Sequence, residues 1–317
     1  MPAPSSTLLG IGLKLISTGM FSVMLALGKA YSNYPVAELV FFRSAFALVP
    51  LVIWLLMRGD FPRALHTARP GGHLIRSFAG IGSMFCLFAS YGLLPIADVT
   101  AIGYVAPLMI VPLAGIFLSE KISAFRWGAV SVGFLGVMII LGEHLMAGGE
   151  GPVRSATGAT FAFTGAVLVS FAMIQTRRLT MTEDTGAITF YFQATTTLAS
   201  ALLLIAALFW PHAWVLGDFL SAQAWVWPPA QDWLPLILIG VFGGVGQIFM
   251  TQGYRYADAS ILAVFDYSSL LFAVAIGLVF FGETPSHAVI AGALLVVAAG
   301  LAVALHENRL RRAMATA

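Results

Sequence analysis

The feature that most constrains this chain is a succession of long apolar segments separated by short polar or Pro/Gly-rich connections. A helix needs about 20 apolar residues to cross the hydrocarbon core of a bilayer. Ten segments meet this length, near residues 9–30, 36–57, 74–94, 98–119, 126–143, 157–176, 186–209, 233–253, 258–282 and 287–306. Only 9% of the 317 residues are charged, whereas soluble domains carry about 25%. The sequence therefore predicts an all-α membrane protein with ten transmembrane helices.

The distribution of Lys and Arg predicts how these helices are oriented. Cytoplasmic loops of membrane proteins carry an excess of the two residues. With ten spans, one side of the membrane receives twelve cations and the other side only Lys29 and Arg154. The twelve are Arg58, Arg63, Arg69, Arg76, Lys121, Arg126, Arg177, Arg178, Arg255, Arg309, Arg311 and Arg312. We therefore expect both termini to lie in the cytoplasm.

The two halves of the chain, residues 1–150 and 151–317, resemble each other. Residues 128–143 align without gaps against residues 292–307. The identical pairs are Gly128/Gly292, Ala129/Ala293, Val132/Val296, Gly136/Gly300, Leu141/Leu305 and Glu143/Glu307, and Tyr104/Tyr267, Phe117/Phe280 and Glu120/Glu283 pair at an offset shorter by one residue. Because each half holds five helices, an odd number, the second must cross the membrane upside down. The sequence predicts two inverted five-helix repeats, an architecture that recurs in secondary transporters.

Several of these segments also resemble a known family. Residues 38–43 (ELVFFR), 95–141 and 258–283 are similar to the drug/metabolite transporter superfamily, in its EamA-type branch. Pro107 of the first repeat stands where the family has it, whereas Leu270 occupies the corresponding position of the second repeat. The resemblance implies a transporter of the bacterial inner membrane whose central cavity opens alternately to either face. It implies amino acids, vitamins or related metabolites as cargo.

Charged residues inside the predicted spans are candidates for function, because a charge at the centre of a spanning helix costs about 2.5–3.5 kcal/mol on insertion scales. Arg43 is predicted to bind a carboxylate of the substrate or of the protein through its planar fork, with snorkelling as the alternative. Asp266 is predicted to pair with a polar group of the bundle, to contact a cationic substrate group, or to carry a coupling proton. For Lys14 and Arg76 we favour the ordinary structural roles of cations near helix ends.

Uncharged residues complete the predicted substrate site. Tyr104 and Tyr267 form a repeat-related pair that is too deep for the interfacial aromatic belt, and we expect both to face a central pocket. The intramembrane glutamines either join helices or line a polar cavity. The remaining candidates are Gln175, Gln193 and Gln247, with Ser17 and Phe85 as weaker members.

The sequence contains no phosphate-binding loop, HExxH motif or CxxC pair. We therefore expect no cofactor, no metal site, no enzymatic activity and no nucleic-acid partner. The expected partners are the lipid bilayer, a small-molecule substrate and either a coupling proton or a counter-substrate.

The predicted function is secondary active transport, with the cargo left open. An amino acid or related amine or carboxylate fits Arg43 and Asp266 as complementary anchors. A planar vitamin- or nucleoside-like compound such as riboflavin fits Tyr104, Tyr267 and the glutamines. A non-transporting membrane enzyme or an assembly subunit is the alternative from a different class. Direction of transport and oligomeric state do not follow from the sequence.

Overall fold

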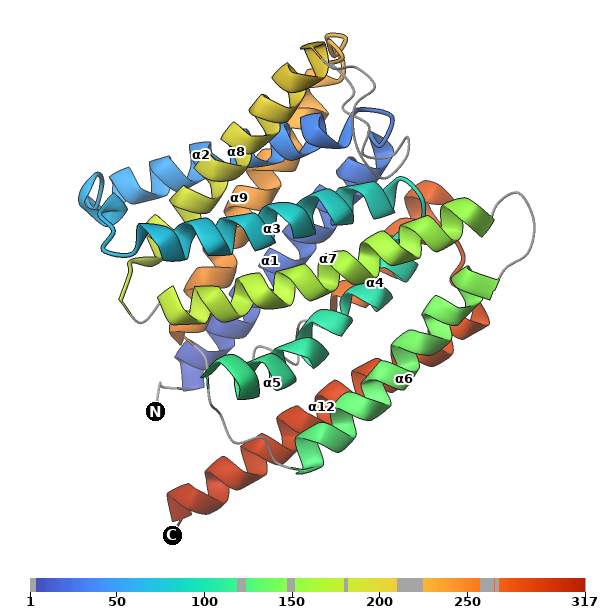
Figure 1. The fold of residues 1–317 in the computed structure, drawn as a ribbon. Helices are drawn as coiled ribbons and strands as arrows, with labels where there is room; N and C mark the ends of the chain where they lie inside the picture. Colours follow the sequence, from blue (N-terminus) through green and yellow to red (C-terminus); the bar gives the residue numbers. More distant parts are fainter. Residues whose placement is uncertain are drawn as a thin grey trace.

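The computed structural model describes residues 4–118, 124–146, 152–179, 182–209, 225–256, 265 and 268–316, and its regular structure in these ranges is entirely helical (Figure 1). The helices are α1 (Pro4–Ala30), α2 (Val36–Met57), α3 (Pro70–Tyr91), α4 (Ile96–Gly103), α5 (Val105–Leu118), α6 (Ala124–Met146), α7 (Pro152–Leu179), α8 (Thr185–Phe209), α9 (Trp233–Tyr256), α11 (Ser268–Ile276) and α12 (His287–Thr316). Two short elements, the 3-10 turn η1 (Arg63–Leu65) and the π-helical turn η3 (Gly277–Phe281), complete them. The prediction of an all-helical chain is confirmed for these residues.

Six of the described helices, α1, α2, α3, α7, α8 and α9, are long and apolar enough to cross a membrane. Shorter apolar segments at 96–110, 127–143, 268–281 and 287–302 lie where the sequence predicts four further spans. One of these predicted spans is broken, because α4 ends at Gly103 and α5 begins at Val105. Tyr104 stands at the break, with φ −68° and ψ −4°.

The principal helix contacts join the first half of the chain to the second. α1 lies along α9, α3 along α7, and α6 along α12, while α2 packs against both α8 and α9. α4 contacts α11, and α5 contacts α7. Figure 1 shows α6 and α12 side by side along one edge of the bundle. The core is therefore built between the halves rather than within each of them.

The outer surface of the described helices is apolar. Phe78 of α3, Leu198 of α8 and Leu294 of α12 are each more than half exposed. Such surfaces are rare on soluble proteins, because exposed apolar area is unfavourable in water. This exterior suits a lipid environment.

α6 and α12 approach most closely at two glycines. A Cβ atom placed on Gly136 would lie 2.6 Å from the carbonyl oxygen of Gly292 and 2.9 Å from the Cβ of Leu295. A Cβ placed on Gly292 would meet the carbonyl oxygen of Gly136 and, at 2.5 Å, the side chain of Ile140. Small residues of this kind allow the backbones of membrane helices to come together.

This contact predicts that Gly136→Ala destabilises the protein, because its new methyl group meets backbone atoms that cannot rotate away. Overpacking of this kind costs about 1–3 kcal/mol. Gly142→Ala, on the same helix, is the matched control, since no described atom lies within 4 Å of its added Cβ. That control should be neutral or gain about 0.5–1 kcal/mol from helix propensity. Thermal unfolding of the detergent-purified variants tests this, and equal midpoints for both would contradict it.

Candidate functional site

Arg43, predicted as a substrate anchor, is buried where α2 meets α8 and α9. Its side chain is 6% exposed, and its Nη1 donates a hydrogen bond of 2.6 Å to Oε1 of Gln193. A Cβ placed on Gly243 of α9 would lie 3.5 Å from its Nε, so α9 covers the guanidinium from another side. Gln193 is buried as well. The structure thus joins two of the predicted site residues by a direct hydrogen bond.

A second arginine, Arg76 of α3, shares an aromatic ring with Arg43. The Cζ atom of Arg76 lies 3.8 Å from the ring centroid of Phe192, and that of Arg43 lies 5.9 Å from it. The Nε of Arg76 donates a hydrogen bond of 3.2 Å to Oγ1 of Thr176, whereas its Nη1 is buried without a hydrogen-bond partner among the described residues. Within the described part of the chain, no carboxylate lies in ion-pair range of either guanidinium.

The ring of Phe192 reaches Arg76 because α3 carries glycine at the point of contact. A Cβ placed on Gly80, one helical turn after Arg76, would lie 2.6 Å from the Phe192 ring. Phe192 also belongs to a buried apolar cluster with Met24, Met84 and Phe88. Phe85, a weaker candidate from the sequence, packs against the same cluster. The two guanidiniums therefore lie beside an apolar wall.

Tyr104, at the break between α4 and α5, contacts α11. Its hydroxyl lies 2.8 Å from Oγ of Ser269, and the side chain is buried. Close by, Oγ of Ser170 on α7 donates to the carbonyl oxygen of Ala106, at 3.1 Å. Polar backbone at membrane depth needs such partners, since lipid supplies none.

The other predicted site residues that the structure describes have partners other than Arg43 in the contacts that are known. Ser17 donates a hydrogen bond of 2.7 Å to the carbonyl oxygen of Gly246 and so joins α1 to α9. Gln247 is the next residue of α9 and is partly exposed. Gln175 accepts a hydrogen bond from Arg178 at 3.4 Å, near the end of α7. Asp266 and Tyr267 lie outside the described residues.

One end of the bundle, where α1 ends, holds an ion pair that the sequence did not predict. Nζ of Lys29 lies 2.7 Å from Oε1 of Glu283, with side-chain exposures of 13% and 19%. Lys29 also donates to the carbonyl oxygen of Leu94 at 2.5 Å, and Glu283 accepts from the backbone N–H of Ile96 at 3.0 Å. The Lys29–Glu283 ion pair, which we call the lock, connects three segments: the end of α1, residues 94–96, and Glu283 after η3. The sequence did distinguish Lys29 from the other cations, because it is one of two cations predicted on its side of the membrane.

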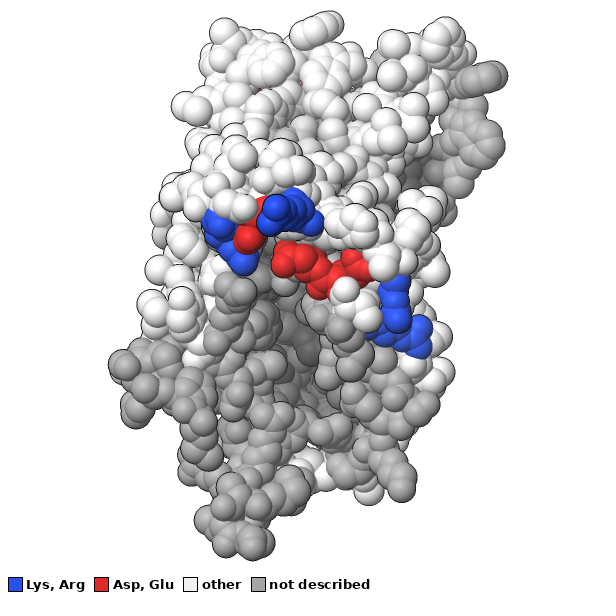
Figure 2. All heavy atoms as spheres, turned by 90° about the vertical axis from the view of Figure 1, so that its left-hand side faces the viewer, with Lys and Arg blue, Asp and Glu red and all other residues white. Residues whose placement is uncertain are grey.

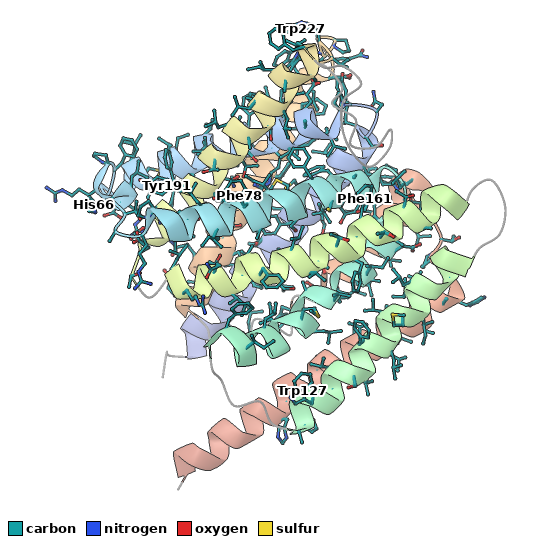
Figure 3. All side chains as sticks on the ribbon, in the orientation of Figure 1. His66, Phe78, Trp127, Phe161, Tyr191 and Trp227 are labelled. Atoms are coloured by element: carbon teal, nitrogen blue, oxygen red, sulfur yellow. The ribbon has the colours of Figure 1, made fainter. Side chains whose placement is uncertain are left out.

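The opposite end, where α2 ends and α3 begins, carries a group of charged residues. Figure 2 looks onto this end and shows Lys, Arg, Asp and Glu in a band across it, and Figure 3 places His66 and Tyr191 there, far from Trp227. His73 lies 3.5 Å from Glu183, which also accepts from the N–H of Ala68 at 3.0 Å. Burial acts to raise the pKa of Glu183, but hydrogen bonds from Thr67, Ala68 and His73 outweigh it and hold that pKa below its usual range.

A cavity of about 460 Å³ opens at this same end, between the first turn of α3 and the last turns of α7. Arg69, Gln175 and Arg178 line it. Gln175 therefore lines a cavity at the end of the bundle. Thr176, the partner of Arg76, is the next residue along α7.

Comparison of the sequence with known proteins identifies the family of this chain. The model of the EamA-like transporter family matches residues 8–142 and, separately, residues 156–305. The chain belongs to the EamA-like transporter family. It is similar to the pseudopaline exporter CntI of Pseudomonas aeruginosa, with 31% identity over 300 residues that cover 93% of this chain and 95% of that protein.

Other EamA-type relatives carry different substrates in their names. The riboflavin transporter of Brucella anthropi is 30% identical over 271 residues, which cover 85% of this chain and 88% of that protein. The S-adenosylmethionine uptake transporter of Rickettsia felis is 25% identical, with 95% and 94% covered. A solved crystal structure at 22% identity covers 96% of this chain and 98% of its own with a TM-score of 0.64, which shows a shared fold. The expected family, and a transporter rather than an enzyme, are confirmed.

Proposed function

We propose that this protein is a secondary active transporter that moves a small metabolite across the bacterial inner membrane by alternating access. The observation that carries the proposal is the buried guanidinium of Arg43, held by Gln193 where the two halves of the chain meet. Ionisable groups inside membrane bundles mark substrate pathways, and transporters of repeat architecture bind substrate between their repeats.

The proposal includes ten spans arranged as two inverted repeats, residues 1–150 and 151–317. Exchanging the repeats maps α1 onto α7 and α3 onto α9, so the contact of α1 with α9 corresponds to that of α7 with α3. α2 with α8, α4 with α11, and α6 with α12 each pair a helix with its own counterpart. This symmetry of contacts and the two separate family matches support the arrangement.

Alternating access requires that each end of the bundle open in turn. The Lys29–Glu283 lock lies at one end and the His73–Glu183 contact at the other. The asymmetry of Lys and Arg supports a periplasmic position for the lock and cytoplasmic termini. Opening on the periplasmic side then has to break an ion pair and its backbone hydrogen bonds.

The cargo we propose is an amino acid or a related amine or carboxylate. The guanidinium of Arg43, which has no ion-pair partner among the described residues, favours a carboxylate-bearing solute. Asp266 remains the proposed coupling carboxylate and Tyr267 the proposed partner of Tyr104. The names of the relatives keep a planar vitamin or adenosine-containing solute as the second candidate.

Uptake by proteoliposomes tests the function directly. Purified protein should give saturable, protein-dependent uptake of at least one radiolabelled solute from a panel of amino acids, carboxylates, riboflavin and S-adenosylmethionine. Accumulation that rises with an imposed pH gradient would support proton coupling, and stimulation only by internal unlabelled solute would support exchange. Uptake no faster than in protein-free liposomes for the whole panel would contradict the proposal.

A further inference from the structure

We propose that Arg43 and Arg76 form one two-arginine site that selects substrates bearing two separate carboxylates. The inference rests on the proposed transport function and narrows its substrate class. Arg43 belongs to α2 and Arg76 to α3, and both guanidiniums lie over the ring of Phe192.

No described carboxylate compensates the positive charge of the two arginines. Buried charges in membrane bundles are normally paired, because an isolated ion loses its hydration without a replacement. Here two cations lie at the same aromatic ring. Among the residues of known placement, their polar contacts are the neutral groups of Gln193 and Thr176. A bound solute with two negative charges would neutralise both.

The N–H groups that the two guanidiniums leave for a ligand fit two carboxylates better than one. Arg43 uses Nη1 for Gln193 and Arg76 uses Nε for Thr176, so each guanidinium retains N–H groups for a ligand. The Nη1 of Arg76 is buried and has no partner in the part of the chain that the structure describes, so it is available to donate to a ligand. A carboxylate matches each planar fork, and two forks on different helices match two carboxylates.

The surroundings supply the apolar contact that a carbon chain between two carboxylates needs. The face of Phe192 lies 3.8 Å from Cζ of Arg76, and stacking on this ring fixes the plane of the guanidinium. Gly80 leaves room for that ring against α3. In the proposed complex a short aliphatic linker contacts this ring.

Further cations lie at the charged end of the bundle, from which α3 leads toward this site. Arg69 and Arg178 line the cavity at that end. Arg69 directly precedes α3, and Arg76 lies six residues after the start of that helix. The carboxylate of Glu183 also lies at this end, where it accepts from the N–H of Ala68.

Ligand-induced thermal stabilisation of the detergent-purified full-length protein tests the inference without requiring transport. Malonate, succinate, glutarate and adipate are compared with acetate, propionate, butyrate and inorganic phosphate at equal ionic strength. A ligand that binds only the folded state raises the Tm. We expect at least one dicarboxylate to raise the Tm by several degrees more than every monocarboxylate and more than phosphate. A shift no larger than that of the monocarboxylates, or an equal shift with phosphate, would overturn the inference.

Variants separate a binding role of Arg76 from a structural one. In Arg76→Gln the dicarboxylate shift should fall to the monocarboxylate level, while the ligand-free Tm should not fall, because a buried cation without an ion-pair partner among the described residues has been removed. Arg63→Gln, at an exposed position of η1, is the matched control and should keep the full shift. If Arg76→Gln does not yield folded protein, Arg76→Lys keeps the charge without the fork and should still lose most of the shift. An unchanged shift in the Arg76 variant would overturn the inference.

The same measurements separate this inference from the proposed function. Dicarboxylate binding that depends on Arg76, without uptake of any panel solute, would leave the site standing and remove the transport proposal. Saturable uptake of another solute, without preferential binding of any dicarboxylate, would leave transport standing and remove the two-carboxylate site.

Discussion

Arg43→Lys should reduce the initial rate of substrate uptake at least tenfold, although the substitution preserves the charge. An ammonium is a point charge and cannot hold Gln193 and a carboxylate in the fixed geometry of a planar fork. A hydrogen bond to a charged group contributes about 1.5–3 kcal/mol, so the loss of one or two such bonds corresponds to about 10–100-fold or more in affinity. Initial rates in proteoliposomes of equal protein content, over a range of solute concentrations, measure the effect as a rise in apparent KM.

The control for this substitution is Arg63→Lys, the same exchange at an exposed position. It should transport at the wild-type rate. The Tm of Arg43→Lys without ligand should stay within a few degrees of wild type, because a cation still lies opposite Gln193. Wild-type uptake by Arg43→Lys would show that the guanidinium is not a substrate anchor, and a collapsed Tm would show that it is structural.

The sequence was sufficient to single out Arg43 but not Arg76. Arg43 lies well inside an apolar segment, where hydropathy alone makes a cation conspicuous. Arg76 lies six residues after the start of α3, where hydropathy predicts only a cation at the membrane boundary. Its contact with Phe192 depends on α8 lying close to α3 at Gly80, and no one-dimensional pattern contains that approach.

The break between α4 and α5 at Tyr104 is a backbone feature that the sequence also did not predict. Residues 98–119 form one continuous apolar segment, so hydropathy predicts one span. Pro107 lacks the N–H that would bond the carbonyl oxygen four residues earlier, at Gly103, and α4 ends at that residue. The proline was visible in the sequence, but whether such a residue kinks or ends a helix depends on neighbouring groups such as Ser170 and Ser269.

The ends of the bundle were the least predictable part. Lys29 and Glu283 are 254 positions apart, and each reads as an ordinary polar residue at a helix end. Their contact requires the packing of α1 against α11 and the turn between α3 and α4. Repeat analysis identified Glu283 as a paired position, yet it could not name the cation opposite.

Lys29→Glu should therefore open the end that this lock closes and strongly impair transport. It places a second carboxylate where the ammonium lies 2.7 Å from Glu283, and like charges at this distance repel strongly in a partly buried site. The variant also loses the donor to the Leu94 carbonyl oxygen. A transporter that cannot close one end cannot complete alternating access, so we expect uptake to fall at least tenfold.

A cysteine reporter beside the lock measures the opening itself. Ser90→Cys places a thiol at a buried position next to Tyr91, whose carbonyl oxygen lies 3.4 Å from Nζ of Lys29. With Cys86 replaced by Ala, a membrane-impermeant maleimide added outside right-side-out vesicles should label this thiol about tenfold faster in Lys29→Glu than in the parent. Arg58→Glu disrupts an exposed ion pair with Asp60 and serves as the control, since exposed pairs contribute little.

The double variant Lys29→Glu with Glu283→Lys decides between closure by charge pairing and a general disturbance of the helix ends. Reversal restores the ion pair, so labelling of the reporter should slow again and uptake should recover in part. Recovery should be incomplete, because a carboxylate at position 29 cannot donate to the Leu94 carbonyl oxygen, and an ammonium at position 283 cannot accept from the N–H of Ile96. If the double variant labels as fast as Lys29→Glu and transports no better, the ion pair is not what holds this end closed.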